Sequence, residues 1–308
     1  MPYRLVKGEF RLTYQGERRV GSRPDGDSLW FKPNRPANLN NIGHRDAELN
    51  PGGFAQLRFE GIDALELHYP GSDHQHAGSA VAARDYLLGR VGFSNITYAT
   101  NADIPTCVQT YTPVSVRGYI LTRAIDPYGR PVAFVYVGSG SESDGDDRVF
   151  LTVARLDQSL NAHLMRQGHV YPGYYTPREI NGEMVGGLPW DLRDRLTEHA
   201  ISAWNYNRGV WPVDDSRNNP QIRNRERLMQ LAVWPKLYRR MANYFRDGNT
   251  GLGNFVSWLN DPEHRRTRND QVLILPLGEI QNLTDTFTVT GNRINMLYWP
   301  EELVIVPR

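Results

Sequence analysis

The segment "SVRGYILTRAIDPYGRPVAFVYVG", residues 115–138, decides the fold because it predicts two long strands joined by a tight turn. β-Branched and aromatic residues are concentrated on both sides of the short "DPYG" sequence, as is typical of neighbouring strands. Pro127 suits the second position of a β-turn, and Gly129 suits the last. We therefore predict a β-hairpin here.

The chain before this hairpin also predicts strands. From residue 8 to about residue 31, short alternating stretches are separated by the turn-forming segments "QGE" and "RPDGD". Residues 32–53 are dense in Pro, Asn and Gly, which predicts a long loop before the strand-like "FAQLRFEGID". Residues 77–90 place apolar side chains at helical spacing and are followed by Gly92, so we predict a helix there.

The chain after the hairpin predicts helices. "LDQSLNAHLMRQGHV" and "PWDLRDRLTEHAISAWNYNRGVW" each have helical spacing and a closing glycine, Gly168 and Gly209. Strands followed by helices indicate an α+β fold. The polar segment "PVDDSRNNP", residues 212–220, predicts a domain boundary, with one domain at 1–214 and a smaller α+β accessory domain at 215–308.

The predicted accessory domain starts with a helix at about 222–246 that carries both arginines and aromatic residues. This combination could contact a nucleic-acid backbone. The aromatic residues could equally pack in a core while the arginines form a solvated face. A homo-oligomer or partner-protein interface is a further alternative, and the sequence leaves all of these open.

The overall composition excludes binding of nucleic acid by net charge alone, because 35 Lys and Arg residues nearly balance 34 Asp and Glu residues. Cys107 is the single cysteine and cannot form an intramolecular disulfide. The first residues, "MPYRLVKGEF", lack the apolar stretch of a secretory signal, so we expect a cytoplasmic protein. No apolar run approaches the roughly 18 to 20 residues that a membrane span needs, so we expect no membrane association.

Three segments carry charged side chains that could form a catalytic site: "RPDGDSLWF" with Asp27, "RFEGIDALE" with Arg58, Asp63 and Glu66, and "DPYGR" with Arg130. Each segment also has an ordinary structural explanation. Asp-Gly-Asp is a common turn and recurs at residues 144–146. The other four residues could be solvated side chains at strand ends or in a turn.

Taken together, these side chains would be sufficient for metal-assisted cleavage of a phosphodiester. Two carboxylates could bind a hard divalent cation through oxygen ligands. Two guanidinium groups could grip a phosphate, and a third carboxylate could position or deprotonate a water.

The order of the three motifs resembles the staphylococcal nuclease (thermonuclease) family, which has an Asp-Gly-Asp-Thr-like turn, an Arg-Leu-x-x-x-Asp-x-Pro-Glu-like strand end and Asp-x-Tyr-Gly-Arg. Here they stand as "DGDS", "RFEGIDALE" and "DPYGR", followed by "LNAHLMRQGHV", and the resemblance covers about residues 8–214. It implies an OB-fold β-barrel with packed helices, a Ca²⁺ ion, with Mg²⁺ or Mn²⁺ as alternatives, and hydrolysis of DNA or RNA. By position, it implies calcium ligands at Asp27 and Asp63, a water-activating carboxylate at Glu66 and a phosphate clamp at Arg58 and Arg130.

Two positions qualify what the resemblance implies. Leu65 stands where the family usually has proline, which could loosen the chain before Glu66. Tyr174 falls near the family position where a tyrosine meets the substrate nucleotide, and it could stack on a base or pack in the core. The main alternative to a nuclease is a binding module for nucleic acid or protein built on the same scaffold. Such modules typically lose the acidic and arginine residues, whereas this chain has all five.

Overall fold

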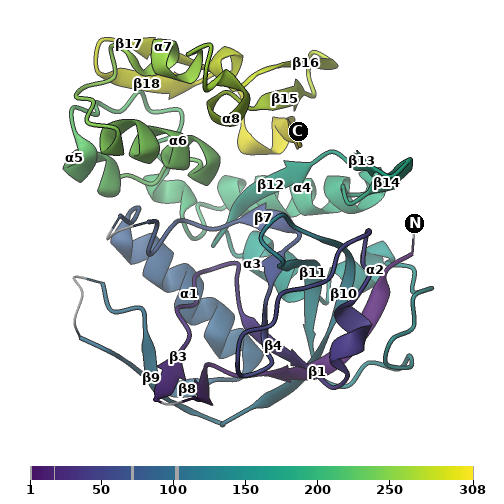
Figure 1. Cartoon of the computed structure of the whole chain (residues 1–308). Coiled ribbons are helices and arrows are strands. Elements are labelled where there is room, and N and C mark those ends of the chain that lie inside the picture. The colour runs from purple at the N-terminus through teal and green to yellow at the C-terminus, as the bar shows by residue number, and fades with distance from the viewer. Residues whose placement is uncertain (1, 17, 71–72, 101–103, 308) are drawn as a thin grey trace.

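The computed structural model describes residues 2–16, 18–70, 73–100 and 104–307 (Figure 1). Strands dominate the N-terminal part, helices cover it, and the C-terminal residues lie above it in the view of Figure 1. The predicted α+β class is confirmed. Within the described ranges, no helix combines the length and the apolar character needed to cross a bilayer.

The largest sheet curls into a nearly closed, barrel-like layer. Its strand order is β5 (Ala55–Gln56), β4 (Trp30–Pro33), β1 (Arg4–Phe10), β10 (Val116–Ile125), β11 (Pro131–Val137) and β6 (Arg58–Phe59). The first and last strands of this order are separated along the chain only by Leu57. The two edges of the sheet must therefore lie close together, which curves the sheet round its core.

The predicted hairpin is confirmed as β10 and β11, which pair antiparallel from Gly118 opposite Val137 to Ile125 opposite Pro131. The turn between them is shaped by Asp126, whose Oδ1 accepts the backbone N–H groups of Tyr128 and Arg130 at 2.9 and 3.0 Å. The segment "DPYGR" therefore has a structural function, which is to fix the direction in which Arg130 leaves the hairpin.

A second sheet joins the barrel to the C-terminal residues, in the order β16 (Glu279–Asn282), β15 (Gln271–Ile274), β19 (Leu303–Val306), β12 (Tyr171–Tyr175) and β7 (Gly61–Asp63). β12 pairs antiparallel with β7 on one side and parallel with β19 on the other. Residues on both sides of position 214 thus share one hydrogen-bonded sheet. Asp214, inside the predicted linker, is buried, and its carboxylate accepts the hydroxyl of Tyr171 at 2.7 Å.

Short two-stranded sheets complete the strand content. They are β2 (Thr13–Gln15) with β3 (Arg19–Gly21), β8 (Ser94–Tyr98) with β9 (Val108–Thr112), β13 (Arg178–Ile180) with β14 (Glu183–Val185), and β17 (Phe287–Thr290) with β18 (Arg293–Met296).

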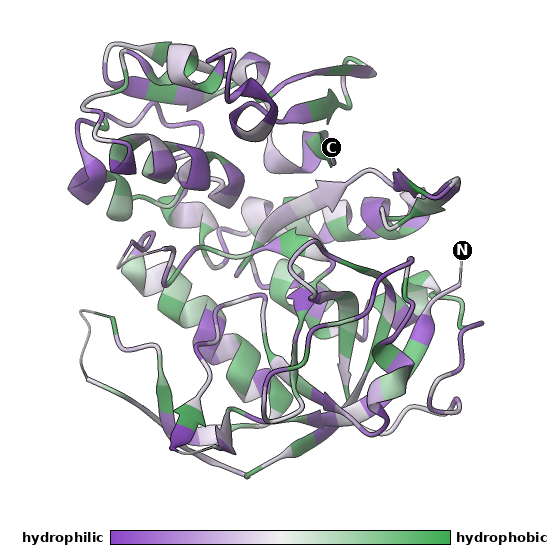
Figure 2. Cartoon of the chain, viewed as in Figure 1, coloured by the Kyte–Doolittle hydropathy of each residue, from purple (hydrophilic) through white to green (hydrophobic). Residues whose placement is uncertain are grey.

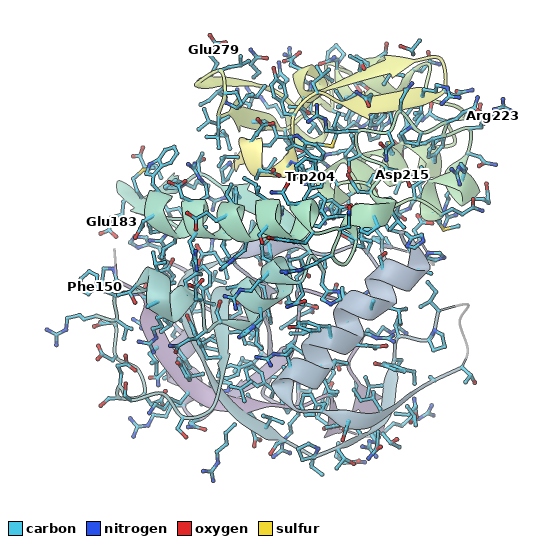
Figure 3. All side chains as sticks on the ribbon, turned by 180° about the vertical axis from the view of Figure 1, so that it is seen from behind. Phe150, Glu183, Trp204, Asp215, Arg223 and Glu279 are labelled. Carbon is cyan, nitrogen blue, oxygen red and sulfur yellow. The ribbon has the colours of Figure 1, made fainter. Side chains whose placement is uncertain are left out.

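The helices of the N-terminal part are α1 (Ala77–Val91), α2 (Val153–Leu156), α3 (Leu160–Arg166) and α4 (Trp190–Asn205). The prediction of a helix at 77–90 is confirmed. α3 packs against α1, α4 and β11. Seen from behind in Figure 3, α4 runs between the two parts of the molecule, with Trp204 against Trp299 of the C-terminal part at a ring distance of 5.0 Å.

The C-terminal part contains the helices α5 (Arg225–Met229), α6 (Pro235–Arg246), α7 (Phe255–Leu259) and α8 (Arg265–Arg268). The prediction of one continuous helix at 222–246 is wrong, because the chain leaves the helical conformation between α5 and α6. Trp234 precedes a proline and has a non-helical ψ of 121°, in line with the steric clash before proline that disfavours the helical conformation. The intervening residues pair instead with other loops, since Leu231 accepts the N–H of His76 and Ala232 accepts that of Asp215.

The remaining short elements are the 3₁₀ turns η1 (Pro36–Leu39), η2 (Trp211–Val213), η3 (Leu283–Thr286) and η4 (Pro300–Glu302). Two groups of buried side chains form the core: one fills the barrel and extends under α3 and α4, and the other lies in the C-terminal part. Figure 2 shows the corresponding alternation of apolar and polar residues along α1 and the strands. Leu65 and Leu67 belong to the C-terminal group, although they follow β7 directly.

One buried amide closes the barrel where the ladder between β11 and β6 ends. Asn161 of α3 is fully buried and accepts the N–H of Val135 at 3.0 Å. It also donates to the carbonyl groups of Glu60 and Ala133 at 2.9 and 3.0 Å.

We predict that Asn161→Leu lowers the free energy of unfolding by about 3 kcal/mol, because it leaves buried backbone groups without partners. Denaturant unfolding measures the change. Asn254→Ala is the control, since this exposed residue makes no side-chain cap bond at the start of α7. Equal stability of the two variants would contradict the structural function of Asn161.

Candidate functional site

A cavity of about 920 Å³ lies between the barrel and α6, and its lining includes all five predicted catalytic and metal-binding residues. Asp27 comes from the loop before β4, Arg58 from β6, Asp63 from the end of β7, Glu66 from the following loop and Arg130 from the hairpin turn. The structure thus brings together side chains that are up to 103 residues apart, the separation of Asp27 and Arg130. This convergence depends on the barrel, since the carbonyl of Asp27 accepts the N–H of Phe59 next to Arg58.

Aromatic side chains form much of the remaining wall. They are Tyr14, Trp30, Phe54, Tyr69, Tyr128 and Tyr175. Tyr128 is 74 % exposed and lies in the hairpin turn beside Arg130, whose guanidinium is 5.5 Å from the ring centre. The pocket therefore presents flat apolar faces next to its charged groups.

Both carboxylates of the Asp-Gly-Asp turn line the pocket, and each also makes a hydrogen bond within the fold. Asp25 Oδ1 accepts the hydroxyl of Ser28 at 2.5 Å, so Asp25 shapes the turn. Asp27 Oδ2 accepts the N–H of Ala64 at 3.0 Å, which places Asp27 beside the end of β7. Gly26 is required because a Cβ would lie 2.8 Å from the Cβ atoms of Ala64 and Ala83.

Asp27 lies in an unfavourable electrostatic environment. Burial raises its pKa well above the ordinary value, and the neighbouring carboxylates of Asp25 and Asp63 raise it further. The N–H of Ala64, which donates to the carboxylate, acts against these effects. The pocket around Asp27 would thus gain stability from an added positive charge.

Asp63 and Glu66 bind a residue that the sequence did not assign to the site, Arg239 of α6. Its two terminal nitrogens lie 3.0 and 2.6 Å from the two carboxylate oxygens of Asp63, and one of them also lies 2.7 Å from Glu66 Oε1. Burial raises the pKa of Glu66, while the charge and hydrogen bond of Arg239 act in the opposite direction. The sequence placed Arg239 in a basic helix but gave no signal that this helix would meet residues more than 170 positions earlier.

Each of the two predicted clamp arginines has a side-chain partner. Arg58 donates to the hydroxyl of Tyr175 at 2.8 Å. Burial alone would raise the pKa of Tyr175, but the positive charges of Arg58 and Lys236 outweigh it and lower this pKa. Arg130 donates from Nε to Asp126 Oδ2 at 2.7 Å.

Tyr174 does not line this pocket. It is buried, and its hydroxyl lies 2.9 Å from Thr197 Oγ1 on α4. Successive side chains of a strand point to opposite faces, so the next residue of β12, Tyr175, faces the pocket instead. Choosing between the two tyrosines required the register of β12, which the sequence alone does not give.

The donor set suits a hard divalent cation in chemical type, because Asp27, Asp63 and Glu66 offer only oxygen atoms. In the described part of the chain, no group of three or more His, Cys, Asp and Glu side chains has an arrangement ready to hold a metal ion. Arg239 already contacts both carboxylate oxygens of Asp63. The residues fit a metal on condition that this ion pair opens.

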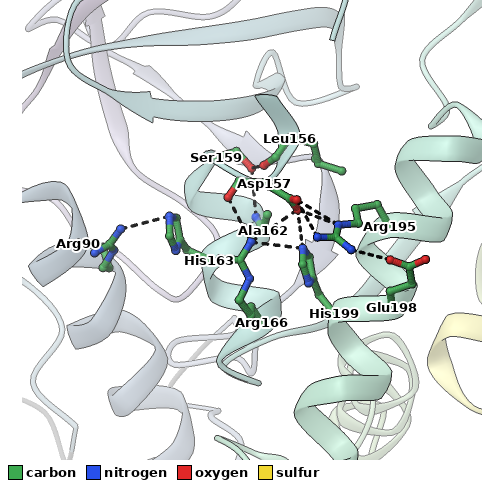
Figure 4. Close-up of polar contacts among 10 residues, drawn as sticks. All are labelled: Arg90, Leu156, Asp157, Ser159, Ala162, His163, Arg166, Arg195, Glu198 and His199. Atoms are coloured by element: carbon green, nitrogen blue, oxygen red, sulfur yellow. Dashed lines mark hydrogen bonds and ion pairs between the residues drawn. The ribbon is translucent and has the colours of Figure 1, made fainter. Parts of the chain in front are cut away.

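A second cluster of titratable side chains lies at the junction of α2, α3 and α4 (Figure 4). Asp157 accepts from Arg195 at 2.8 to 3.1 Å and lies 2.6 Å from His199 Nε2. Burial opposes ionisation of Asp157, but these partners lower its pKa to about 2. These three residues are not among those that line the pocket, and their mutual contacts tie α4 to the end of α2.

A scan of protein-family models and a search of curated proteins both found no match to this sequence.

We predict that Asp27→Asn raises the free energy of unfolding at pH 7, without metal, by on the order of 1 kcal/mol. The folded-state pKa of Asp27 is raised, so its ionisation destabilises the fold as the pH rises above the unfolded value of about 3.9. The amide removes this cost, and the gain should vanish below about pH 4.

Denaturant unfolding of the variant and the unmodified protein, in chelator at pH 7 and near pH 3.5, measures this difference. The lower pH lies roughly in the range where an ordinary aspartate takes up its proton. Asp147→Asn is the control, because the Asp147 side chain is 65 % exposed. A loss of stability at pH 7 in Asp27→Asn would show that Asp27 is not electrostatically strained.

Proposed function

We propose that this protein is a metal-dependent phosphodiesterase that hydrolyses DNA, RNA or both. The observation that carries the proposal is the meeting of Asp27, Asp63, Glu66, Arg58 and Arg130, from three separate segments, in one pocket. Turns and solvated strand ends give no reason for these five side chains to converge. We further propose that the curved sheet is an OB-fold barrel of the staphylococcal nuclease type, which the strand order β1–β10–β11 and the packed helices support.

In the proposed reaction, the charged side chains of the pocket have different roles. Arg58 and Arg130 bind the phosphate and stabilise the negative charge that increases as the attacking oxygen adds. Glu66 orients the water and takes its proton. A divalent cation held by Asp27 and Asp63 would supply additional positive charge next to the phosphate oxygens.

The aromatic wall supports a nucleic-acid substrate over a small phosphate ester. Exposed rings such as Tyr128 can stack on bases of any sequence, which contributes about 1 to 3 kcal/mol per base. Tyr128 lies beside Arg130, so this stacking surface is next to the proposed phosphate site.

The second candidate function is a binding module for nucleic acid that cleaves weakly or not at all. The ion pairs of Arg239 with Asp63 and Glu66 favour it, because they engage the carboxylates that catalysis would use. Incubation of the protein with labelled single- and double-stranded DNA and RNA, with Ca²⁺, Mg²⁺, Mn²⁺ or chelator, separates the two functions. Cleavage that needs a divalent cation supports the nuclease, and binding without cleavage under every condition supports the module.

We predict that Glu66→Gln lowers the cleavage rate by roughly a hundredfold to ten-thousandfold, because it removes the base but keeps the size of the side chain. Nucleic-acid binding, measured separately by fluorescence anisotropy, should remain. If the variant cleaves at the rate of the unmodified protein, another group activates the water.

We predict that Arg58→Ala and Arg130→Ala each lower turnover by on the order of a hundredfold to a thousandfold, since each removes a donor to the developing charge. Arg148→Ala provides the control, because that side chain is 88 % exposed. Thermal unfolding of all three variants separates lost catalysis from lost stability. Normal turnover in either folded clamp variant would rule out a phosphate clamp.

A further inference from the structure

Arg239 is the cation that touches the carboxylates of the pocket most closely. Its guanidinium makes two parallel contacts to Asp63 and one to Glu66, at 2.6 to 3.0 Å. Two-point geometry of this kind gives the stronger class of ion pair. Arg239 lies on α6, whose neighbouring residues Tyr238 and Met241 are fully buried in the C-terminal core, so the helix presents Arg239 from a rigid support.

The charge balance explains why a cation is needed there. Asp25, Asp27, Asp63 and Glu66 all line this one pocket. Several carboxylates in one partly buried site destabilise each other unless a positive charge compensates them. Arg239 supplies one positive charge to this group.

A divalent cation at Asp63 would require the same oxygens. The guanidinium occupies both of them from the side of α6, and two cations on one carboxylate repel each other. Binding of a metal ion and the ion pair of Arg239 with Asp63 therefore oppose each other.

We propose that Arg239 is an exchangeable counter-ion of the metal site: it compensates Asp63 in the metal-free protein and is displaced from Asp63 when a divalent cation binds. This inference rests on the proposed function, because it takes Asp27 and Asp63 as metal ligands. The C-terminal part of the chain thereby sets the metal affinity of a site whose ligands all come from the N-terminal part.

The surroundings allow the exchange without movement of α6. Lys236 and Arg240, on the same helix, are bound to Asp270 at 3.1 and 2.6 Å and would keep those contacts. Arg239 also contacts Glu66, so its side chain keeps one partner when it leaves Asp63.

The test is calorimetric titration of Ca²⁺ and of Mn²⁺ into the full-length chain, comparing the unmodified protein with Arg239→Met. Methionine keeps an unbranched apolar stem but removes the charge and the hydrogen-bond donors of the guanidinium. We expect Ca²⁺ to bind to the variant at least about tenfold more tightly, since the competing ion pair is gone. In chelator the variant should unfold at a lower temperature, and added Ca²⁺ should raise that temperature more than it does for the unmodified protein.

Arg240→Met is the matched control. It removes the same charge from the next residue of α6, which also lines the pocket but pairs with Asp270. Its Ca²⁺ affinity should stay close to that of the unmodified protein. If Arg240→Met tightens Ca²⁺ binding as much as Arg239→Met, the loss of any positive charge near the pocket explains the effect, and the specific exchange is wrong.

Equal or weaker Ca²⁺ and Mn²⁺ binding to Arg239→Met overturns the proposal, as does the absence of metal binding in both proteins. If Arg239→Met does not fold, Arg239→Lys retains the charge with a single-point contact and should bind Ca²⁺ more tightly than the unmodified protein; unchanged or weaker binding then overturns it. Cleavage is measured separately. If cleavage depends on metal but Arg239→Met binds metal with unchanged affinity, the proposed function stands and the exchange is wrong. If Arg239→Met binds metal more tightly but neither it nor the unmodified protein cleaves nucleic acid, the exchange is supported and the nuclease function is wrong.

Discussion

The pairing of β12 with two different strands is the constraint on which the rest of the molecule depends. β12 pairs antiparallel with β7, which puts Tyr171 opposite Asp63, and parallel with β19, which puts Tyr175 beside Ile305. One strand thus fixes the end of β7, the tyrosine that contacts Arg58 and the position of the C-terminal part. A shift of one residue in this register would turn Tyr174 toward the pocket and Tyr175 toward α4.

The pocket at this junction shows a local conflict between stability and chemistry. Asp27 is a half-buried carboxylate near other carboxylates, which destabilises the folded state at neutral pH. Arg239 compensates part of the same charge by binding Asp63 and Glu66. Clusters of like charge in a cleft are typical of functional sites, because they shift pKa values and bind ions, whereas folding alone disfavours them.

Local features of the structure could be predicted from the sequence, and features that depend on long-range packing could not. The hairpin of β10 and β11 follows from strand-forming residues around "DPYG", and Asp25 and Asp126 fill the turn positions that suit aspartate. The five predicted site residues lie in short motifs whose spacing is visible along the chain. Arg239 is separated from Glu66 by 173 residues, so only tertiary structure brings them together. Pro235 indicates a helix break, but the helical spacing of apolar residues on both sides of it led to the prediction of one continuous helix.

The position of Leu65 shows why the site cannot be understood from the N-terminal part alone. A proline at this position would stiffen the chain before Glu66, and leucine does not. The structure uses packing instead, because Leu65 is buried in the C-terminal core. Glu66 is held at both backbone groups by Gln75: its N–H donates to Gln75 Oε1 at 3.1 Å and its carbonyl accepts the N–H of Gln75 at 2.8 Å.

Gln75 is itself fixed from the C-terminal side, since its Nε2 donates to the carbonyl of Val233 at 2.6 Å. The segment that carries Glu66 is therefore supported by three contacts with residues beyond position 214: the burial of Leu65, the bond from Gln75 to Val233 and the ion pair of Glu66 with Arg239. The C-terminal part contributes none of the five predicted site residues. It nevertheless determines where Glu66 lies, so the two parts of the chain build the pocket together.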